Sequence, residues 1–227
     1  MKKCRRPVGV FDSGVGGLTV AKEIIRQLPG EDIVYFGDTA HVPYGAKSVK
    51  TVTELSTANV GFLMRFGVKA VVVACNTTSA LCLGALKNRF DIPLIGVIAP
   101  GARAAVRATR NGRIGVIGTA GTVRSGAYDR EIRKIKPGIR VFGMACPLFV
   151  PLVEEGWIDK SVTRLAASEY LSGLKKSGVD TLVLGCTHYP FLKKVIGAVM
   201  GKNVRLIDSA EETARTLKSL MSDMHIL

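Results

Sequence analysis

Short apolar runs alternate with longer segments of helical periodicity along the whole chain, and this alternation restricts the fold more than any other feature. The runs that could form buried strands are 8–11, 32–37, 70–75, 93–98, 113–118, 139–144, 181–186 and 204–208. Helical segments follow near 17–28, 48–66, 78–89, 122–135, 161–176 and 190–200, and a last helix follows the final run. Strands that alternate with helices form βαβ units and a parallel sheet, so the sequence predicts an α/β protein.

The second half of the chain repeats the pattern of the first. Three strand ends stay nearly in register when the halves are aligned, at separations of 107, 106 and 111 residues: Asp12 with Thr119, Phe36 with Phe142, and Cys75 with Cys186. We infer two similar domains that arose by duplication. Each is expected to be a mainly parallel sheet flanked by helices, and a pseudo-twofold axis would relate the two.

The predicted boundary lies near the Pro100-Gly101 dipeptide. The first domain would then comprise residues 1–99, with the C-terminal segment 208–227 returning to it, and the second would comprise residues 100–207.

Cysteines or polar residues stand at or just after several predicted strand ends: Asp12, Asp38, Cys75, Thr119 and Cys186. In an open parallel sheet, ligands bind beyond the carboxyl ends of the strands. If the two domains face each other, Cys75 and Cys186 lie on opposite sides of a bound substrate. The sequence therefore predicts an active site in the cleft between the domains.

The two cysteines occur at matched strand-to-helix turns, in "VVVACNTTSA" and "LVLGCTHYPF". Helix amide groups at such a turn favour the thiolate. A lone cysteine after a strand is more often an inert core residue. Two in matched positions favour catalysis, because each is followed by hydrogen-bonding side chains, Asn76 and Thr77 after the first and Thr187 and His188 after the second.

Two other uses of cysteine and histidine have less support. The chain has no CxxC or HExxH pattern and only three histidines, so no tetrahedral zinc ligand set is visible and no metal is expected. A thiol protease built on Cys186 and His188 would leave the matched Cys75 without a role.

Two polar loops of the first half offer ligand contacts. The segment "FDSGVGGLTV" lacks the spacing of nucleotide-binding loops, but a glycine-rich turn before a helix still presents amides to a carboxylate. Asp12 and Ser13 begin that turn. In "GDTAHVPYGAKS", Tyr44 and Gly45 are expected at the cleft rim.

Two segments of the second half offer further candidates. "VIGTAGTV" contains Thr119 and Thr122, and "CPLFVPLVEEG" contains Glu154 and Glu155. Glutamates in such a segment more often form a solvated helix face than a catalytic group.

The net charge of +14 makes nucleic acid or another polyanion a partner to consider. The basic residues are scattered, however, without a zinc-finger pattern, a recognition helix or an aromatic-studded strand. We favour a solvated basic surface, which would also attract a small dicarboxylate. Nucleic-acid contact stays an alternative.

No apolar run approaches the length needed to cross a bilayer, and the start "MKKCRRPVGVFDSG" lacks the features of a secretory signal. The five cysteines lie mostly at apolar or strand-end positions, which favours reduced thiols over a disulfide framework. We therefore expect a cytoplasmic protein without membrane contact.

These motifs, in this order from residue 9 to residue 210, resemble those of the bacterial glutamate racemases in the cofactor-independent aspartate/glutamate racemase superfamily. The pattern "CNT" with a later "CT" alone would suit the wider superfamily, including aspartate and hydantoin racemases. "DTAHVPYG" and "GCTHYP" together point to the glutamate enzymes.

The resemblance implies reversible conversion of L-glutamate to D-glutamate, a precursor of peptidoglycan, without pyridoxal phosphate or a metal. It implies that Cys75 and Cys186 are acid/base groups on opposite faces of the substrate α-carbon, the first acting on the D-isomer and the second on the L-isomer. Asp12 and His188 would assist the thiols, with further help from Asp38 and Glu154.

The resemblance also implies the substrate contacts, which are Asp12, Ser13, Tyr44, Gly45, Asn76, Thr77, Thr119, Thr122, Thr187 and His188. A homodimer is the expected assembly. Two alternatives stay open: a racemase for aspartate or another amino acid, and, since some relatives affect DNA gyrase, a gyrase-related or nucleic-acid-binding role.

Overall fold

The computed structural model describes residues 6–227 and contains two parallel, four-stranded sheets. Residues 1–5 lie outside the described residues. They belong to the predicted first domain and to its basic N-terminal stretch. The strands are β1 (Val8–Asp12), β2 (Ile33–Gly37), β3 (Ala70–Val73), β4 (Leu94–Gly96), β5 (Arg113–Gly118), β6 (Arg140–Ala145), β7 (Thr181–Gly185) and β8 (Arg205–Ile207). Every predicted strand is present.

Helices connect the strands and flank both sheets. They are α1 (Leu18–Gln27), α2 (Val49–Met64), α3 (Asn76–Leu81), α4 (Leu83–Arg89), α5 (Ile98–Ala108), α6 (Ala120–Arg124), α7 (Ala127–Ile135), α8 (Phe149–Glu154), α9 (Ser161–Lys176), α10 (Lys193–Met200) and α11 (Ser209–Asp223). Short 3-10 helices span Thr39–His41, Tyr44–Ala46 and Tyr189–Leu192. None of the helices within residues 6–227 combines the length and the apolar character needed to cross a membrane.

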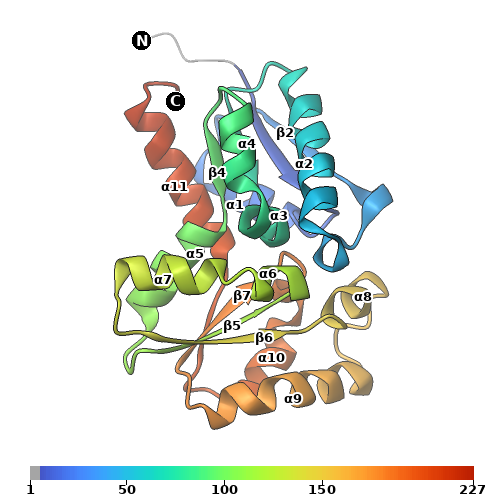
Figure 1. The fold of residues 1–227 in the computed structure, drawn as a ribbon, viewed down its shortest axis with the longest axis vertical. Coiled ribbons are helices and arrows are strands. Elements are labelled where there is room, and N and C mark those ends of the chain that lie inside the picture. Colours follow the sequence, from blue (N-terminus) through green and yellow to red (C-terminus); the bar gives the residue numbers. More distant parts are fainter. Residues whose placement is uncertain (1–5) are drawn as a thin grey trace.

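The two sheets have the same strand order, β2-β1-β3-β4 and β6-β5-β7-β8. Strands β1, β3 and β7 are buried along their whole length, as expected for parallel strands covered by helices on both faces. Figure 1 shows the two sheets as an upper and a lower layer, each with its own helices. The predicted two-domain α/β fold is confirmed, and the matching strand orders agree with the internal repeat.

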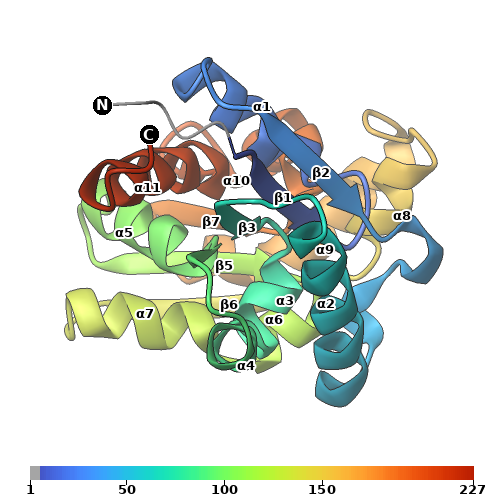
Figure 2. The ribbon, with the colours of Figure 1, turned by 90° about the horizontal axis from the view of Figure 1, so that it is seen from above.

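Four hydrophobic clusters fill the spaces between the sheets and their helices. On the first sheet, α1 and α11 cover one face, and α2 and α4 cover the other. On the second sheet, α5 and α7 cover one face, and α8, α9 and α10 cover the other. Although α11 ends the chain, it lies beside α1 and α5, as the view from above shows (Figure 2).

The chain passes between the two sheets twice. It leaves the first sheet at Val97, after β4, and it returns at Asp208, between β8 and α11. Both crossings lie close to the predicted domain limits, 1–99 with 208–227 and 100–207, which themselves stay a prediction. The two sheets are thus separate layers, and the chain backbone connects them at these two crossings.

The Pro100-Gly101 dipeptide, predicted as an interdomain boundary, lies inside α5. Proline is tolerated in the first helical turn, because its missing N–H would have no partner within the helix there. A Cβ on Gly101 would come within 3.2 Å of Tyr128 and of Ser209, so the glycine permits close packing here.

Two helices predicted as continuous are interrupted. The segment 78–89 forms α3 and α4, which meet at Cys82, and the segment 122–135 forms α6 and α7. Gly126 separates the latter pair with a φ of 65°, a left-handed conformation that glycine adopts without steric cost.

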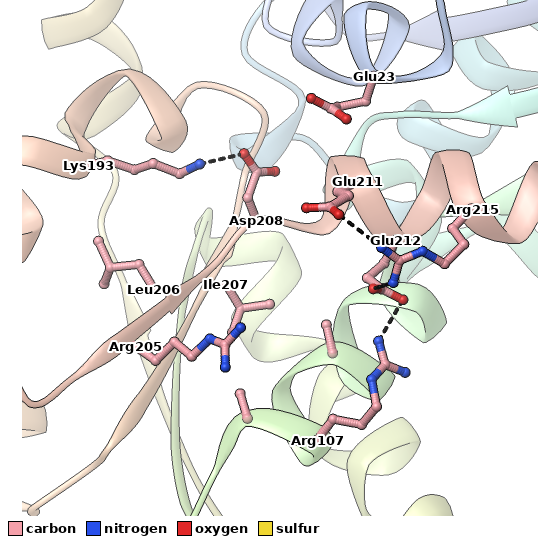
Figure 3. Close-up of a pocket in the computed structure, with 12 residues that line it drawn as sticks. Glu23, Arg107, Lys193, Arg205, Leu206, Ile207, Asp208, Glu211, Glu212 and Arg215 are labelled. Carbon is pink, nitrogen blue, oxygen red and sulfur yellow. Dashed lines mark hydrogen bonds and ion pairs between the residues drawn. The ribbon is translucent and has the colours of Figure 1, made fainter. Parts of the chain in front are cut away.

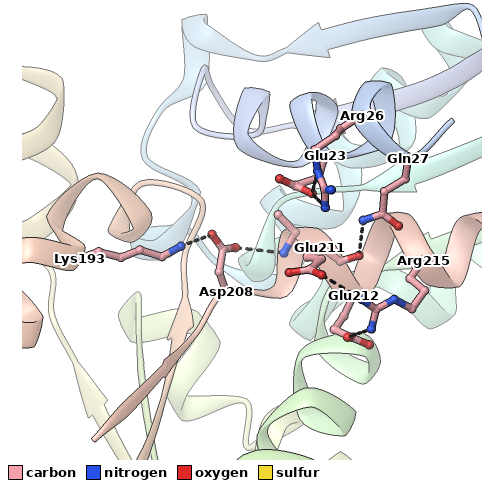
Figure 4. Close-up of polar contacts among 9 residues, drawn as sticks. Glu23, Arg26, Gln27, Lys193, Asp208, Glu211, Glu212 and Arg215 are labelled. Carbon is pink, nitrogen blue, oxygen red and sulfur yellow. Dashed lines mark hydrogen bonds and ion pairs between the residues drawn. The ribbon is translucent and has the colours of Figure 1, made fainter. Parts of the chain in front are cut away.

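Charged side chains gather around the second crossing (Figure 3). Arg107 of α5 pairs with Glu212 of α11 at 2.7 Å, and Lys193 of α10 pairs with Asp208 at 2.9 Å. The Gln27 side chain of α1 also donates to the Glu211 carbonyl oxygen at 3.1 Å (Figure 4). These contacts join helices of both sheets around a pocket of about 430 Å³.

Candidate active site

Cys75 lies between β3 and α3 and forms the N-cap of that helix. The Thr78 amide donates to its Sγ atom at 3.5 Å, and the thiol donates to the Ser13 hydroxyl at 3.4 Å. Burial raises the pKa of the Cys75 thiol, and the negative charge of Asp12 raises it further. The hydrogen bonds that Cys75 forms with Thr78 and Ser13 only partly oppose this shift.

Cys186 follows β7, the strand of the second sheet that corresponds to β3. Its Sγ lies 3.9 Å from Nδ1 of His188, and Nε2 of the same imidazole forms a short hydrogen bond with Glu154 of α8. Burial raises the pKa of the Cys186 thiol, with added contributions from the charges of Cys75 and Asp12. The arrangement is a connected chain of thiol, imidazole and carboxylate.

Asp12 ends β1 and is fully buried. Its Oδ2 accepts hydrogen bonds from the Gly17 amide at 2.8 Å, the Gly14 amide at 3.3 Å and the Thr187 hydroxyl at 3.4 Å. Its Oδ1 has no hydrogen-bond partner among residues 6–227. Burial raises the pKa of Asp12 despite those amides and nearby His188.

Asp38 supports the loop that carries Tyr44. It accepts hydrogen bonds from the Tyr44 hydroxyl at 2.5 Å and from Asn59 of α2 at 3.5 Å, and it pairs with His41 at 2.7 Å. Burial raises the pKa of Asp38, but these three partners outweigh it and hold the pKa below its usual range. Asp38 is therefore an anionic anchor for Tyr44.

Threonine hydroxyls connect the two sides of the site. Thr77 of α3 lies 2.9 Å from Thr119, the N-cap of α6, and Thr119 lies 3.1 Å from Thr122. Gly45 packs closely against the same side chain, because a Cβ on Gly45 would come within 2.3 Å of the Thr119 Cβ. The two layers are thus in direct contact at the site.

A small pocket lies between the carboxyl ends of the two sheets, with a volume of about 20 Å³. Its lining residues are Ser13, Val42, Pro43, Tyr44, Gly45, Cys75, Asn76, Thr77, Thr119, Val150, Cys186, Thr187 and His188. Both cysteines line it, and this volume holds about one water molecule. The structure therefore presents a closed site.

Four residues proposed from the sequence lie behind this lining rather than in it: Asp12, Asp38, Thr122 and Glu154. Each contacts a lining residue through the hydrogen bonds described above. Sequence reasoning missed three lining residues, Val42, Pro43 and Val150, because apolar side chains in loops and short helices carry no chemical signal. These residues also line an adjoining apolar pocket of about 330 Å³, so they lie between the closed site and that pocket.

All four cysteines in the described part of the chain are free thiols. Within residues 6–227, no group of three or more histidine, cysteine, aspartate or glutamate side chains is arranged to hold a metal ion. The raised pKa of each pocket cysteine favours the protonated thiol in the closed site. A ligand ammonium group would favour the thiolate, so a cationic amine could activate either cysteine as a base.

Known proteins resemble this chain in sequence and in fold. The family model for Asp/Glu/Hydantoin racemase matches residues 8–217. The glutamate racemase of Geobacter metallireducens is 58% identical over 222 residues, which cover 98% of this chain and 82% of that protein. The chain therefore belongs to the Asp/Glu/Hydantoin racemase family.

Solved structures of glutamate racemases have the same fold as this chain. Glutamate racemase isoform RacE1 from Bacillus anthracis has a TM-score of 0.96 at 46% identity, covering 99% of this chain and 84% of that one. The glutamate racemase of Francisella tularensis, solved in complex with D-glutamate, has a TM-score of 0.92 at 40% identity, covering 98% and 83%. The predicted resemblance to glutamate racemases is confirmed, and so is the prediction that the protein is a racemase.

Proposed function

We propose that the protein interconverts L- and D-glutamate by moving a proton between the substrate α-carbon and two thiols. One observation carries this proposal: Cys75 and Cys186 follow the corresponding strands β3 and β7 of two matching sheets, and both line one closed pocket. The relatives support glutamate as the substrate, because those compared above are glutamate racemases and one was solved with D-glutamate.

In the proposed reaction, one thiolate removes the α-proton and the opposite thiol returns a proton to the other face. With D-glutamate, the Cys75 thiolate becomes a thiol and the Cys186 thiol becomes a thiolate. The L-isomer requires the reverse. Each turnover therefore leaves the enzyme in the protonation state that suits the other enantiomer, and the protons must redistribute before the same enantiomer can react again.

The polar groups around the thiols would hold the substrate and stabilise charge. Hydroxyls and amides of the predicted contacts can bind the two carboxylates, as preorganised donors do at developing negative charge. We assign His188 and Glu154 to the Cys186 side, because they form one hydrogen-bonded chain with that thiol. Asp12 lies behind the pocket, where it accepts a hydrogen bond from Thr187, and its negative charge raises the pKa of both thiols.

Substrate entry would require the cleft to open, since glutamate is far larger than the single water molecule that the closed pocket accommodates. Closure around the substrate would then exclude water and strengthen the electrostatic contacts that lower the barrier. The apolar pocket beside Val42 and Val150 is the natural direction of entry.

We further propose that the enzyme works in the cytoplasm as a homodimer, without pyridoxal phosphate or a metal, and supplies D-glutamate for peptidoglycan. The decisive experiment incubates the protein with L-glutamate and, separately, L-aspartate in D₂O, with a chelator and no added cofactor. Deuterium at Cα together with formation of D-glutamate is the expected result. Faster turnover of aspartate would overturn the substrate, and no exchange with either would overturn the reaction.

A further inference from the structure

Tyr128 of α7 reaches across the cleft to the residue that follows Cys75. Its hydroxyl donates a hydrogen bond of 2.7 Å to Oδ1 of Asn76, the first residue of α3. Because α7 covers the second sheet while α3 follows a strand of the first, this contact joins the two layers. Both side chains are buried, at 3% exposure each.

The hydrogen bond fixes the orientation of the Asn76 amide. An asparagine side chain presents an acceptor oxygen at one end and two donors at the other. With Oδ1 bound by Tyr128, the NH₂ group is directed elsewhere, and Asn76 lines the closed pocket.

Two glycines make room for the Tyr128 ring. A Cβ on Gly101 of α5 would come within 3.2 Å of the ring and of the hydroxyl, and a Cβ on Gly185 would come within 3.2 Å of the other ring edge. Gly185 is the residue before Cys186. The same side chain therefore contacts the neighbour of each pocket cysteine.

We infer that Tyr128 is a positioning residue, which orients the Asn76 amide so that its NH₂ group donates to a substrate carboxylate beside Cys75. This inference rests on the proposed function. The hydroxyl that orients Asn76 comes from α7, which packs on the second sheet, whereas Asn76 follows a strand of the first sheet. The orientation of the Asn76 amide therefore depends on how the two domains pack against each other.

Tyr128→Phe removes the hydroxyl and keeps the ring between its two glycines. We expect KM for both glutamate enantiomers to rise about tenfold, since a carboxylate contact binds ground state and transition state alike, while kcat changes less than about threefold. The fold-decrease in kcat/KM must be the same for both enantiomers, because the ratio of the two kcat/KM values equals the equilibrium constant of the reaction, which no enzyme variant can change. Tyr170→Phe is the matched control, since the Tyr170 hydroxyl contacts the Leu148 amide and lines no part of the pocket.

A double-mutant cycle separates positioning from a general loss of structure. In the Asn76→Ala background, Tyr128→Phe should change KM less than about twofold, because the group it orients is gone. An unchanged KM in Tyr128→Phe alone, or the same tenfold loss in both backgrounds, would overturn the inference.

A second measurement does not depend on activity. The side-chain amide of Asn76 is assigned by NMR as the NH₂ signal missing in Asn76→Ala, and we expect it to shift in Tyr128→Phe and to stay unchanged in Tyr170→Phe. An Asn76 side-chain chemical shift that is the same in Tyr128→Phe as in the wild-type protein would contradict the inference. If the wild-type protein failed to racemise glutamate, the proposed function would fail, and this measurement would still decide whether Tyr128 orients Asn76.

Discussion

The hydroxyl of Thr77 lies 2.9 Å from the hydroxyl of Thr119, and this hydrogen bond joins the helix after β3 to the helix after β5. It marks the place where the two domains meet at the site. An open cleft must break this bond, and a closed one must restore it. How closely the two domains approach each other should therefore depend on small changes of shape around Thr119.

Gly45→Ala tests this sensitivity. The added methyl group would come within 2.3 Å of Thr119, a distance that real Cβ contacts do not show, so the domains cannot close fully. We expect kcat/KM to fall at least about tenfold, since misplacing the reacting groups by even an ångström is costly. Gly61→Ala in α2 is the control, because nothing lies within 4 Å of its added Cβ. That variant should keep full activity, and normal activity in Gly45→Ala would contradict tight closure.

The two thiols should each be essential. Cys75→Ser and Cys186→Ser are each expected to lower kcat for racemisation by about 10²–10⁴-fold, the usual contribution of a positioned acid or base. Elimination from a suitable substrate analogue needs proton removal from one face only, so it should depend unequally on the two variants. Cys146→Ser serves as the control, as this buried thiol lines no part of the pocket. A racemisation assay that found near-normal turnover in either pocket variant would rule out the two-thiol mechanism.

The kcat/KM of racemisation should rise with pH. The proposed reaction needs one thiolate and one thiol. Burial raises the pKa of both pocket cysteines, so the thiolate is the scarce form near neutral pH. Between about pH 6 and 8, kcat/KM should therefore increase, by up to about tenfold per unit, as the base form becomes populated. A profile measured by circular dichroism that stayed flat over this range would be inconsistent with a raised thiol pKa.

Asp180 should stabilise the second domain in its ionised form. It accepts hydrogen bonds from the Thr109 hydroxyl and from the amides of Arg110 and Asn111 at 2.7–2.8 Å. Burial raises its pKa, but these donors lower it more, so the folded-state pKa lies below the ordinary value. The stabilisation is therefore present above about pH 4 and is lost as the pH falls through the folded-state pKa.

Asp180→Asn should consequently lower the free energy of unfolding by about 1–2 kcal/mol at pH 7, a value reduced by solvent screening at this partly exposed site. Urea unfolding measured at several pH values checks this. The difference from the wild-type protein should shrink below about pH 4. A difference that is independent of pH would exclude the ionised carboxylate as its source.

Local patterns in the sequence predict the strands well because buried parallel strands are continuous apolar runs, as β3 and β7 are. The repeat also predicts that Cys75 and Cys186 occupy equivalent strand ends. Helix α5 was missed, because Pro100 and Gly101 usually interrupt helices, whereas here one lies in the first turn and the other contacts Tyr128.

The supporting residues of the site could not be predicted in the same way. Tyr128 lies in the first turn of α7 and Asn59 in the interior of α2, and in a helix a buried polar side chain looks like any other core residue until its partner is known. Their partners, Asn76 and Tyr44, are distant in sequence. Such contacts depend on how the domains pack, which no short segment of sequence specifies.

The ion pairs at the second crossing have a consequence for the chemistry. Cys75 and Cys186 follow strands of different sheets, so the distance between the two thiols depends on the angle between the domains and is fixed by neither sheet alone. The Arg107 side chain that pairs with Glu212 is more than half exposed, and dissolved salt weakens exposed pairs of this kind. The rate of racemisation should therefore change with ionic strength, even though the pocket around Arg107 shares no residue with the pocket around the thiols. The turnover rate would then report on the relative orientation of the two domains.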